Sequence, residues 1–320
     1  MKLIDGTHFE PTITISDLDS PALEELLSRG YQPQKKLGEG SNRKAFKVTR
    51  QRGHFIEELV AKVPKLEFDI NTIKKEIAAE KQRNGRNWNV QEAIMSTKLW
   101  HPNLARTIDS FDLKDERTVN VEPYYEGSRG LRGEIKLLQE GLPLQAYKGI
   151  MTGILAGVGH MHKNGILHRD LSPDNVIVDK HGTAVVTDLQ TAAFEGQSIP
   201  SLTPTQGRID YTEPRLVNAL LNGKAETATD RSDLYSIGAI GYYLLTGKEP
   251  SSYHLVETAN GSPIQIGNRV VHVSLRRGYT EVKEISSNER RFQLNSMIKV
   301  MREKGIPKQH RSFVLGCMEE

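Results

Sequence analysis

Three side chains in the middle of the sequence have the chemistry needed for phosphate transfer. Asp170 and Asn175 lie five residues apart in the stretch His168-Arg169-Asp170-Leu171-Ser172-Pro173-Asp174-Asn175, and Asp188 follows one apolar run later. Carboxylate and amide oxygens are the ligands that hard divalent cations prefer, and a further carboxylate can orient a hydroxyl group. These residue types at this spacing predict a metal-assisted phosphoryl-transfer site.

Short β-forming segments on either side must position these side chains. Gly165-Ile166-Leu167 precedes the loop, and Val176-Ile177-Val178 follows it as the first strand of a hairpin that ends near Asp188. Upstream, residues 144–163 carry apolar residues at spacings of three and four, which predicts a buried helix. We therefore expect an exposed loop that is supported by a helix and by a β-hairpin.

The stretch H-R-D-L-x-x-x-x-N resembles the catalytic loop of protein kinases, and Asp188 resembles the aspartate of their D-F-G motif. The resemblance implies that Asp170 orients or deprotonates the attacking hydroxyl. It further implies that Asn175 and Asp188 bind Mg²⁺, or Mn²⁺, together with ATP. In the family, an arginine at the position of Arg169 lets a phosphorylated residue of the following segment dock, and candidate acceptors are Ser198, Ser201, Thr203 and Thr205.

The N-terminal half resembles the nucleotide-binding elements of the same family. Leu37-Gly38-Glu39-Gly40 looks like the glycine-rich phosphate loop, although Arg43 replaces its third glycine. Lys62, on an apolar strand, resembles the lysine that contacts the α- and β-phosphates, and a helix glutamate, here Glu92, would hold that lysine in place. The resemblance makes the following residues nucleotide-binding candidates: Leu37, Gly38, Gly40, Lys62 and Glu92.

The stretch from Thr118 to Gly127 resembles the fifth strand and the hinge, where backbone groups hydrogen-bond the adenine base. Glu122 and Tyr124 are the predicted nucleotide contacts in this hinge. Val121 is the predicted residue that gates the pocket behind the base, and Pro123 removes one possible N–H donor.

Three positions depart from the family pattern. Ser172 stands where Ser/Thr kinases commonly have a lysine, Gln190 replaces the glycine of D-F-G, and Arg215 replaces the glutamate of A-P-E. Because Arg208 aligns with a residue that contacts the missing lysine, one hypothesis is that Arg208 supplies the lost positive charge. An equally open interpretation is that Arg208 binds acidic substrate residues or faces solvent.

These features favour Mg-ATP-dependent transfer of the γ-phosphate to serine or threonine hydroxyls of a protein, with Asp170 as the base. Asp233 matches the start of the family's central helix, where it would bond the backbone of the catalytic loop. That match, with Arg169, disfavours a small-molecule kinase. A second alternative is a nucleotide-binding pseudokinase that acts as a scaffold, which the altered glycine loop and Ser172 favour and the intact Lys62 and Asp170 oppose.

The resemblance implies an α+β, bilobal fold with a small antiparallel β lobe, a mainly helical large lobe and ATP between them. The expected boundaries are an N-terminal extension over 1–30, the small lobe over 31–121 and the large lobe over 122–320. Ser20-Pro21 predicts an N-cap and the start of a helix over 21–29 that docks on the small lobe. A regulator could act through this extension or through an added helix near 69–83.

Composition narrows the class of protein. The 320 residues are 37% hydrophobic and 26% charged, with a net charge of +3 and one cysteine, Cys317. A single cysteine argues against a disulfide framework, and the small charge does not indicate nucleic-acid binding. The N-terminus lacks the apolar region of a signal peptide, and no long apolar run predicts a membrane span. We expect a cytoplasmic protein with a protein substrate, and neither nucleic-acid nor membrane partners.

Overall fold

The computed structural model divides into two compact units, one of residues 1–100 with 105–126 and one of residues 101–104 with 127–320. The structure describes these parts of the chain: 2–3, 18–39, 43–65, 99–115, 117–126, 129–132, 141–196, 209–221, 226–250, 255–257, 264–266, 269–271, 279–282 and 287–319. Glu92, Arg208, the four predicted phosphate acceptors and the predicted helix near 69–83 lie outside them.

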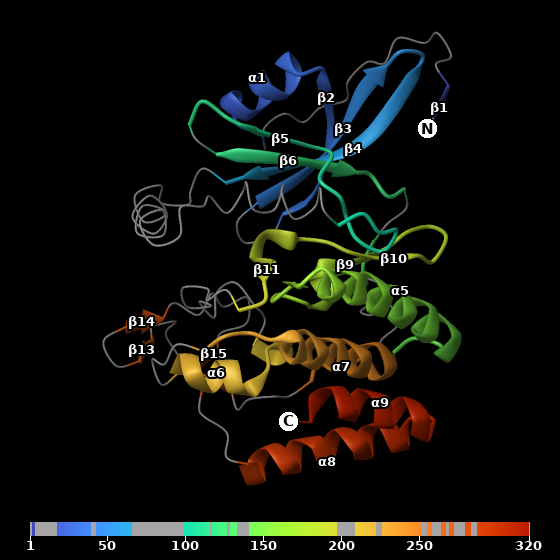
Figure 1. Cartoon of the computed structure of the whole chain (residues 1–320), viewed down its shortest axis with the longest axis vertical. Coiled ribbons are helices and arrows are strands. Elements are labelled where there is room, and N and C mark those ends of the chain that lie inside the picture. The colour runs from blue at the N-terminus through green and yellow to red at the C-terminus, as the bar shows by residue number, and fades with distance from the viewer. Residues whose placement is uncertain are drawn as a thin grey trace. The chain divides into compact units, whose positions relative to one another are not determined.

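An antiparallel sheet forms the first unit (Figure 1). Its main strands are β2 (Tyr31–Glu39), β3 (Arg43–Arg52), β4 (Phe55–Pro64), β5 (Asp109–Asp112) and β6 (Thr118–Pro123). They are ordered β2-β3-β4-β6-β5, and the short strand β1 (Lys2–Leu3) pairs with β4. The placement of β4 beside β6 joins the predicted lysine strand to the predicted hinge strand.

Helix α1 (Ser20–Ser28) begins one residue earlier than the sequence predicts, and its N-cap is Asp19 rather than Ser20. The Asp19 side chain accepts a hydrogen bond from the Ala22 N–H at 3.1 Å. The same carboxylate receives both terminal nitrogens of Arg117, at 2.8 and 2.6 Å. Asp and Ser are similarly good caps, and the bonds from Arg117, directly before β6, explain why Asp19 takes this position.

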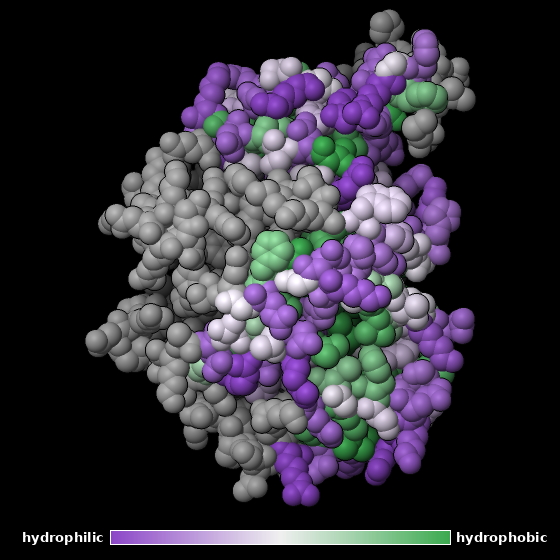
Figure 2. Space-filling view, in the orientation of Figure 1, coloured by the Kyte–Doolittle hydropathy of each residue, from purple (hydrophilic) through white to green (hydrophobic). Residues whose placement is uncertain are grey.

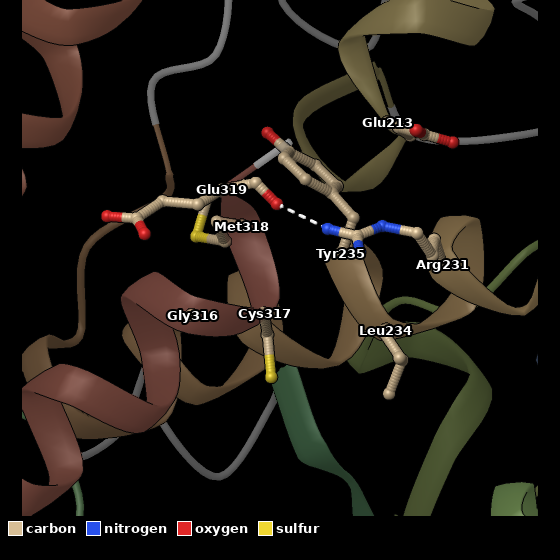
Figure 3. Close-up of a pocket in the computed structure, with 8 residues that line it drawn as sticks. All are labelled: Glu213, Arg231, Leu234, Tyr235, Gly316, Cys317, Met318 and Glu319. Carbon is tan, nitrogen blue, oxygen red and sulfur yellow. Dashed lines mark hydrogen bonds between the residues drawn. The ribbon is translucent and has the colours of Figure 1, made fainter.

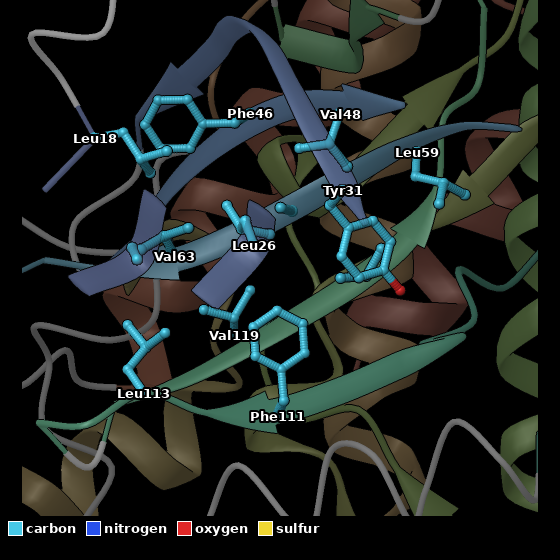
Figure 4. Close-up of a cluster of buried hydrophobic side chains, with 13 residues drawn as sticks. Leu18, Leu26, Tyr31, Phe46, Val48, Leu59, Val63, Phe111, Leu113 and Val119 are labelled. Atoms are coloured by element: carbon cyan, nitrogen blue, oxygen red, sulfur yellow. The ribbon is translucent and has the colours of Figure 1, made fainter. Parts of the chain in front are cut away.

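One face of the sheet packs against α1, as predicted for this helix. Leu26, Ala61 and Val121 are fully buried, and together with the surrounding side chains they form one apolar cluster (Figure 4). The cluster consists of Leu18, Ala22, Leu26, Tyr31, Phe46, Val48, Leu59, Ala61, Val63, Phe111, Leu113, Val119 and Val121. Since strand side chains alternate between faces, Val60 and Lys62 are left on the opposite face of β4.

The second unit is mainly helical. Its helices are α5 (Leu144–Lys163), α6 (Pro214–Leu221), α7 (Asp230–Thr246), α8 (Ser287–Glu303) and α9 (Lys308–Met318), and α5 matches the predicted range. Three strands, β7 (Arg129–Gly130), β9 (Val176–Val178) and β10 (Ala184–Val186), form a sheet in the order β10-β9-β7. The α+β class, with an antiparallel sheet followed by a helical region, is confirmed.

Further short strands pair two by two in this unit. Strand β8 (Ile166–Leu167) pairs with β11 (Ala193–Phe194), β12 (Leu255–Glu257) with β15 (Tyr279–Val282), and β13 (Ile264–Ile266) with β14 (Arg269–Val271). On the face seen in Figure 2, hydrophobic side chains gather in the region of α7 and α9 within a largely hydrophilic surface. Among the described helices, none is long and apolar enough to cross a membrane.

Helix α7 is almost completely buried and approaches α9 closely at Gly238. A Cβ atom added at Gly238 would lie 2.7 Å from the Cβ of Cys317 and 2.9 Å from the carbonyl oxygen of Val314. A pocket of about 110 Å³ opens between the two helices near the same place, bridged by a bond of 2.9 Å from Arg231 to the carbonyl of Glu319 (Figure 3). The helix that carries Asp233 is therefore fixed against α9 by a contact that only glycine allows.

We predict that Gly238→Ala destabilises the protein by about 1–3 kcal/mol, because the added methyl overpacks against the α9 backbone. The matched control is Gly149→Ala on α5, where an added Cβ meets nothing within 4 Å. Alanine has the higher helix propensity, so the control should stabilise the protein by up to about 1 kcal/mol. Urea unfolding of both variants measures the difference, and equal effects would contradict the close approach of α7 and α9.

Candidate active site

The loop between β8 and β9 is anchored by the carboxylate of Asp233, in the first turn of α7. The backbone N–H groups of His168 and Arg169 each donate a hydrogen bond of 2.8 Å to it. Asp233 is only 1% exposed, so these bonds form away from competing water. Arg169 has a left-handed backbone (φ 70°), which is uncommon for a residue other than glycine. The paired bonds hold the loop in this conformation directly before Asp170.

His168 is fully buried and connects the loop to the segment that leads to Asp188. The Asp170 N–H donates to His168 Nδ1 at 3.3 Å, so the ring hydrogen is on Nε2, which lies 3.1 Å from the carbonyl oxygen of Thr187. Burial lowers the pKa of His168, which keeps the ring neutral and this tautomer in place. His168 therefore packs and orients, as its burial suggests, rather than transferring a proton.

Asp170 and Asn175 are in direct contact. Asn175 follows Pro173 in a short 3₁₀ turn, η2 (Pro173–Asn175), and its Nδ2 donates to the carbonyl oxygen of Asp170 at 2.6 Å and to Asp170 Oδ2 at 3.0 Å. Because the amide nitrogen points at Asp170, the amide oxygen is turned the other way. No donor among the described residues binds that oxygen, and it is a suitable ligand for a hard cation.

Asp188 lies after β10, next to Asn175. The N–H of Thr187 donates to the Asn175 carbonyl at 2.9 Å, which fixes the two segments side by side. Asp188 has a left-handed backbone (φ 65°), and its Oδ1 is buried without a hydrogen-bond partner in the described part of the chain. A buried carboxylate oxygen without a partner is costly unless a cation or donor satisfies it. The oxygens of Asn175 and Asp188 thus fit a divalent metal ion.

The described residues contain no group of three or more His, Cys, Asp or Glu side chains placed to bind a metal. Mg²⁺ typically takes one or two carboxylates from the protein and completes its shell with water and phosphate oxygens.

The first unit places Lys62 on β4 opposite Asn120 of β6. Its ammonium lies 2.7 Å from a carboxylate oxygen of Glu122, and both side chains are largely buried. Glu92, the predicted partner of Lys62, lies outside the described residues. The partner seen among the described residues, Glu122, belongs to the sheet. Val121, the predicted gate of the pocket behind the base, lies in the cluster under α1, and the alternation along β6 puts Glu122 on the Lys62 face.

The predicted phosphate loop is described in part. Leu37 and Gly38 end β2, while Gly40 lies outside the described residues. Glu39 beside Gly38 bonds Lys36 at 2.8 Å and also contacts Lys65, and these ammonium groups lower the pKa of Glu39 to about 2. In the predicted hinge, the Tyr124 N–H donates to the Glu58 carbonyl at 3.2 Å, and the Tyr124 ring lies 4.3 Å from the Lys47 ammonium.

Comparison with known proteins agrees with this geometry. The sequence profile of the protein kinase domain matches residues 31–309. The chain belongs to the protein kinase family. It is 31% identical over 163 residues to the serine/threonine-protein kinase PrkC of Bacillus subtilis. This matched region covers 50% of the present chain and 24% of PrkC. It is 28% identical over 244 residues to serine/threonine-protein kinase 36 of Pongo abelii, covering 73% of this chain and 16% of that protein.

A third relative, the probable serine/threonine-protein kinase PknB of Lactococcus lactis, is 33% identical over 165 residues, with 50% of this chain and 24% of the relative covered. The matched regions of the two bacterial relatives are thus about a quarter of their length, so their names describe much longer proteins. What the comparison establishes here is the kinase domain itself, with the loop of Asp170 and the strand of Lys62 inside the matched range.

Two departures from the kinase pattern, Ser172 and Arg215, lie among the described residues. Ser172 is buried, and its carbonyl accepts the Asn175 N–H at 3.0 Å. Arg215 contacts Glu226, bonds the Thr227 carbonyl at 3.1 Å and lies 3.3 Å from Glu213. The positive charge of Arg215 is therefore balanced by the carboxylates of Glu213 and Glu226.

Sequence reasoning missed Arg132, which joins three distant segments of this kinase. Its Nε lies 3.1 Å from Asp174, next to Asn175, and its guanidinium also contacts Glu249 after α7. Glu249 in turn accepts the Tyr211 hydroxyl at 2.6 Å. Burial alone would lower the pKa of Arg132, but Tyr211 and the two carboxylates outweigh it and raise the pKa above its usual value. No local pattern indicates this network, because the partners lie 42 and 117 residues away.

His162 at the end of α5 also contacts Asp233, with 2.8 Å between Nε2 and Oδ2. Burial lowers the pKa of His162, but the hydrogen bond and charge of Asp233 outweigh it and raise the pKa overall. A histidine whose pKa is higher in the folded state stabilises the fold below the unfolded pKa, about 6.5. That stabilisation is lost as the pH rises through the folded-state pKa.

We predict that His162→Gln costs about 1–2 kcal/mol of stability at pH 6, because it removes a hydrogen bond between charged groups. The cost should become smaller as the pH is raised from 6 to 8.5, because the wild-type ring loses its charge as the pH passes its raised folded-state pKa. Urea unfolding of wild type and variant at both pH values measures this cost. His168, whose pKa is lowered, changes the stability of both proteins with pH in the same way, so its contribution cancels in the difference between them. A difference that does not change with pH would show that His162 is not charged in the folded protein.

Proposed function

We propose that the chain is a Mg-ATP-dependent serine/threonine protein kinase that transfers the γ-phosphate to a protein hydroxyl. The observation that supports this most strongly is the arrangement around the loop of Asp170. Asp170 is bonded to Asn175, and Asp188 is held beside Asn175 with a buried oxygen that has no partner among the described residues. Such a set offers one carboxylate for a hydroxyl and two oxygens for a cation.

Each residue has a role in this proposal. The Asp170 carboxylate, held by the bond from Asn175 Nδ2 to its Oδ2, accepts the hydrogen of the attacking hydroxyl. Asn175 and Asp188 would hold Mg²⁺ (Mn²⁺ has similar ligand preferences), and the bound ion neutralises charge on the phosphates. Lys62 binds the α- and β-phosphates, and backbone groups near Glu122 and Tyr124 bind the base, other than the Tyr124 N–H, which is bonded to the Glu58 carbonyl. Leu37, Gly38 and Gly40 cover the nucleotide.

The acceptor is a serine or threonine of a protein, in line with the names of the relatives. The low cysteine content favours a reducing compartment, so we place the kinase in the cytoplasm. A regulator could act through the N-terminal extension or through the segment before Glu92. A competing proposal is a pseudokinase scaffold, which the replacement of the glycine after Leu189 by Gln190 favours.

Incubation with γ-labelled ATP and Mg²⁺ tests the proposal. Asp170→Ala should lower transfer to a generic protein by about 10²–10⁴-fold, because the hydroxyl loses its acceptor, while nucleotide binding persists. Phosphoamino-acid analysis should find phosphoserine or phosphothreonine.

Asp179→Ala is the matched control. Asp179 accepts backbone N–H groups of His181 and Thr183 in the hairpin turn between β9 and β10, at 2.9 and 2.8 Å. Its loss should cost some stability and leave transfer per folded molecule unchanged. If the wild type and Asp170→Ala both bind nucleotide but label the substrate no more than background, the result would instead support the pseudokinase. Labelling of added small hydroxyl compounds alone would support a small-molecule kinase.

A further inference from the structure

The face of the first sheet opposite α1 is polar along β6. Val119 and Val121 are part of the apolar cluster, while Thr118, Asn120 and Glu122 alternate onto the other face and are only 2%, 0% and 6% exposed. Burying polar side chains is unfavourable unless their hydrogen-bonding groups are satisfied. Three such residues in one strand therefore mark a face with a specific polar arrangement.

The register brings Glu122 close to Lys62 on this face. Lys62 lies opposite Asn120 and Glu122 lies opposite Val60, so the two charged residues are diagonal neighbours on adjacent strands. Diagonal neighbours are within reach of long side chains. The ammonium nitrogen and a carboxylate oxygen are 2.7 Å apart, and the side chains are 16% and 7% exposed.

This pair constrains Lys62 strongly. A lysine side chain has many accessible rotamers, and a carboxylate at fixed distance selects among them. Because water is largely excluded, loss of the carboxylate would leave a buried charge with less compensation. Both partners belong to strands that are hydrogen-bonded to each other, so the contact is formed within the sheet and requires no movement of a helix.

We propose that Glu122 is a positioning residue that orients the Lys62 ammonium toward the phosphates of the nucleotide. The proposal rests on the function proposed above, because it assumes that Lys62 binds phosphate. It assigns the Glu122 side chain a role beyond the backbone contacts expected of a hinge residue. The geometry of β4 and β6 then contributes directly to the position from which Lys62 binds phosphate.

A double-mutant cycle on the full chain tests this. The variants are Glu122→Gln, Lys62→Met and the double variant, and the readout is the Kd of a fluorescent ATP analogue with Mg²⁺, which does not require turnover. Glu122→Gln should weaken binding about tenfold, as loss of a group that orients a ligand-binding side chain typically does. In the Lys62→Met background the same change should have almost no further effect, because two residues that act as a unit are not additive.

Glu57→Gln is the matched control. Glu57 lies on β4 and pairs with Arg50 at 2.9 Å, with side chains 26% and 20% exposed, at the other end of the strand from Lys62. It removes a carboxylate from a cross-strand pair of the same sheet and should leave the Kd unchanged. If Glu122→Gln is unfolded at the assay temperature, Glu122→Asp replaces it, since the shorter carboxylate keeps its charge and loses its reach; weaker binding is again expected.

The outcomes separate the two proposals. If Lys62→Met weakens binding and the Glu122 variants do not, the role of Glu122 is overturned and the proposed function remains. The role of Glu122 is also overturned if Glu122→Gln raises the Kd by the same factor in the Lys62→Met background as in the wild-type protein, because Glu122 would then act without Lys62. If the folded wild-type protein binds no nucleotide at all, the proposed function itself fails.

Discussion

A single buried carboxylate, that of Asp233, fixes the catalytic loop. It accepts the N–H groups of two consecutive residues, His168 and Arg169, that lie more than sixty positions earlier in the chain. These bonds stabilise the left-handed conformation of Arg169, which would otherwise be unfavourable. The loop, the tautomer of His168 and the contact between Asp170 and Asn175 all depend on this anchor. The anchor in turn depends on the close packing of α7 at Gly238.

Much of this site could be predicted from the sequence, since local patterns specify it. One loop and one short hairpin set the spacing of Asp170, Asn175 and Asp188. The residue types and their distances along the chain are therefore enough to predict that these three side chains lie near one another. The range of α5 follows from its apolar periodicity, and the antiparallel sheet followed by a helical region follows from the family resemblance. Within these segments, a neighbour in space is also close in sequence.

What the sequence could not predict depends on register and on contacts between distant residues. A strand has a two-residue period, so a shift of one position changes which face a side chain occupies. This is why the Glu122 side chain was not recognised as a partner of Lys62. Arg132 was missed because its partners, Asp174 and Glu249, lie in separate segments. The N-cap Asp19 was missed because Arg117, 98 residues away, helps to hold it.

The most direct test of this account is the turnover of Asp233→Asn. The amide replaces one of the two oxygens that accept the loop N–H groups, so the loop should shift while the sheet of the first unit is unchanged. We expect kcat for phosphate transfer to fall by about 100-fold, as small misplacements of catalytic groups produce. The Kd for nucleotide should change little, and the variant should remain folded by circular dichroism. A folded variant with wild-type kcat would contradict the claim that Asp233 positions Asp170 and Asn175.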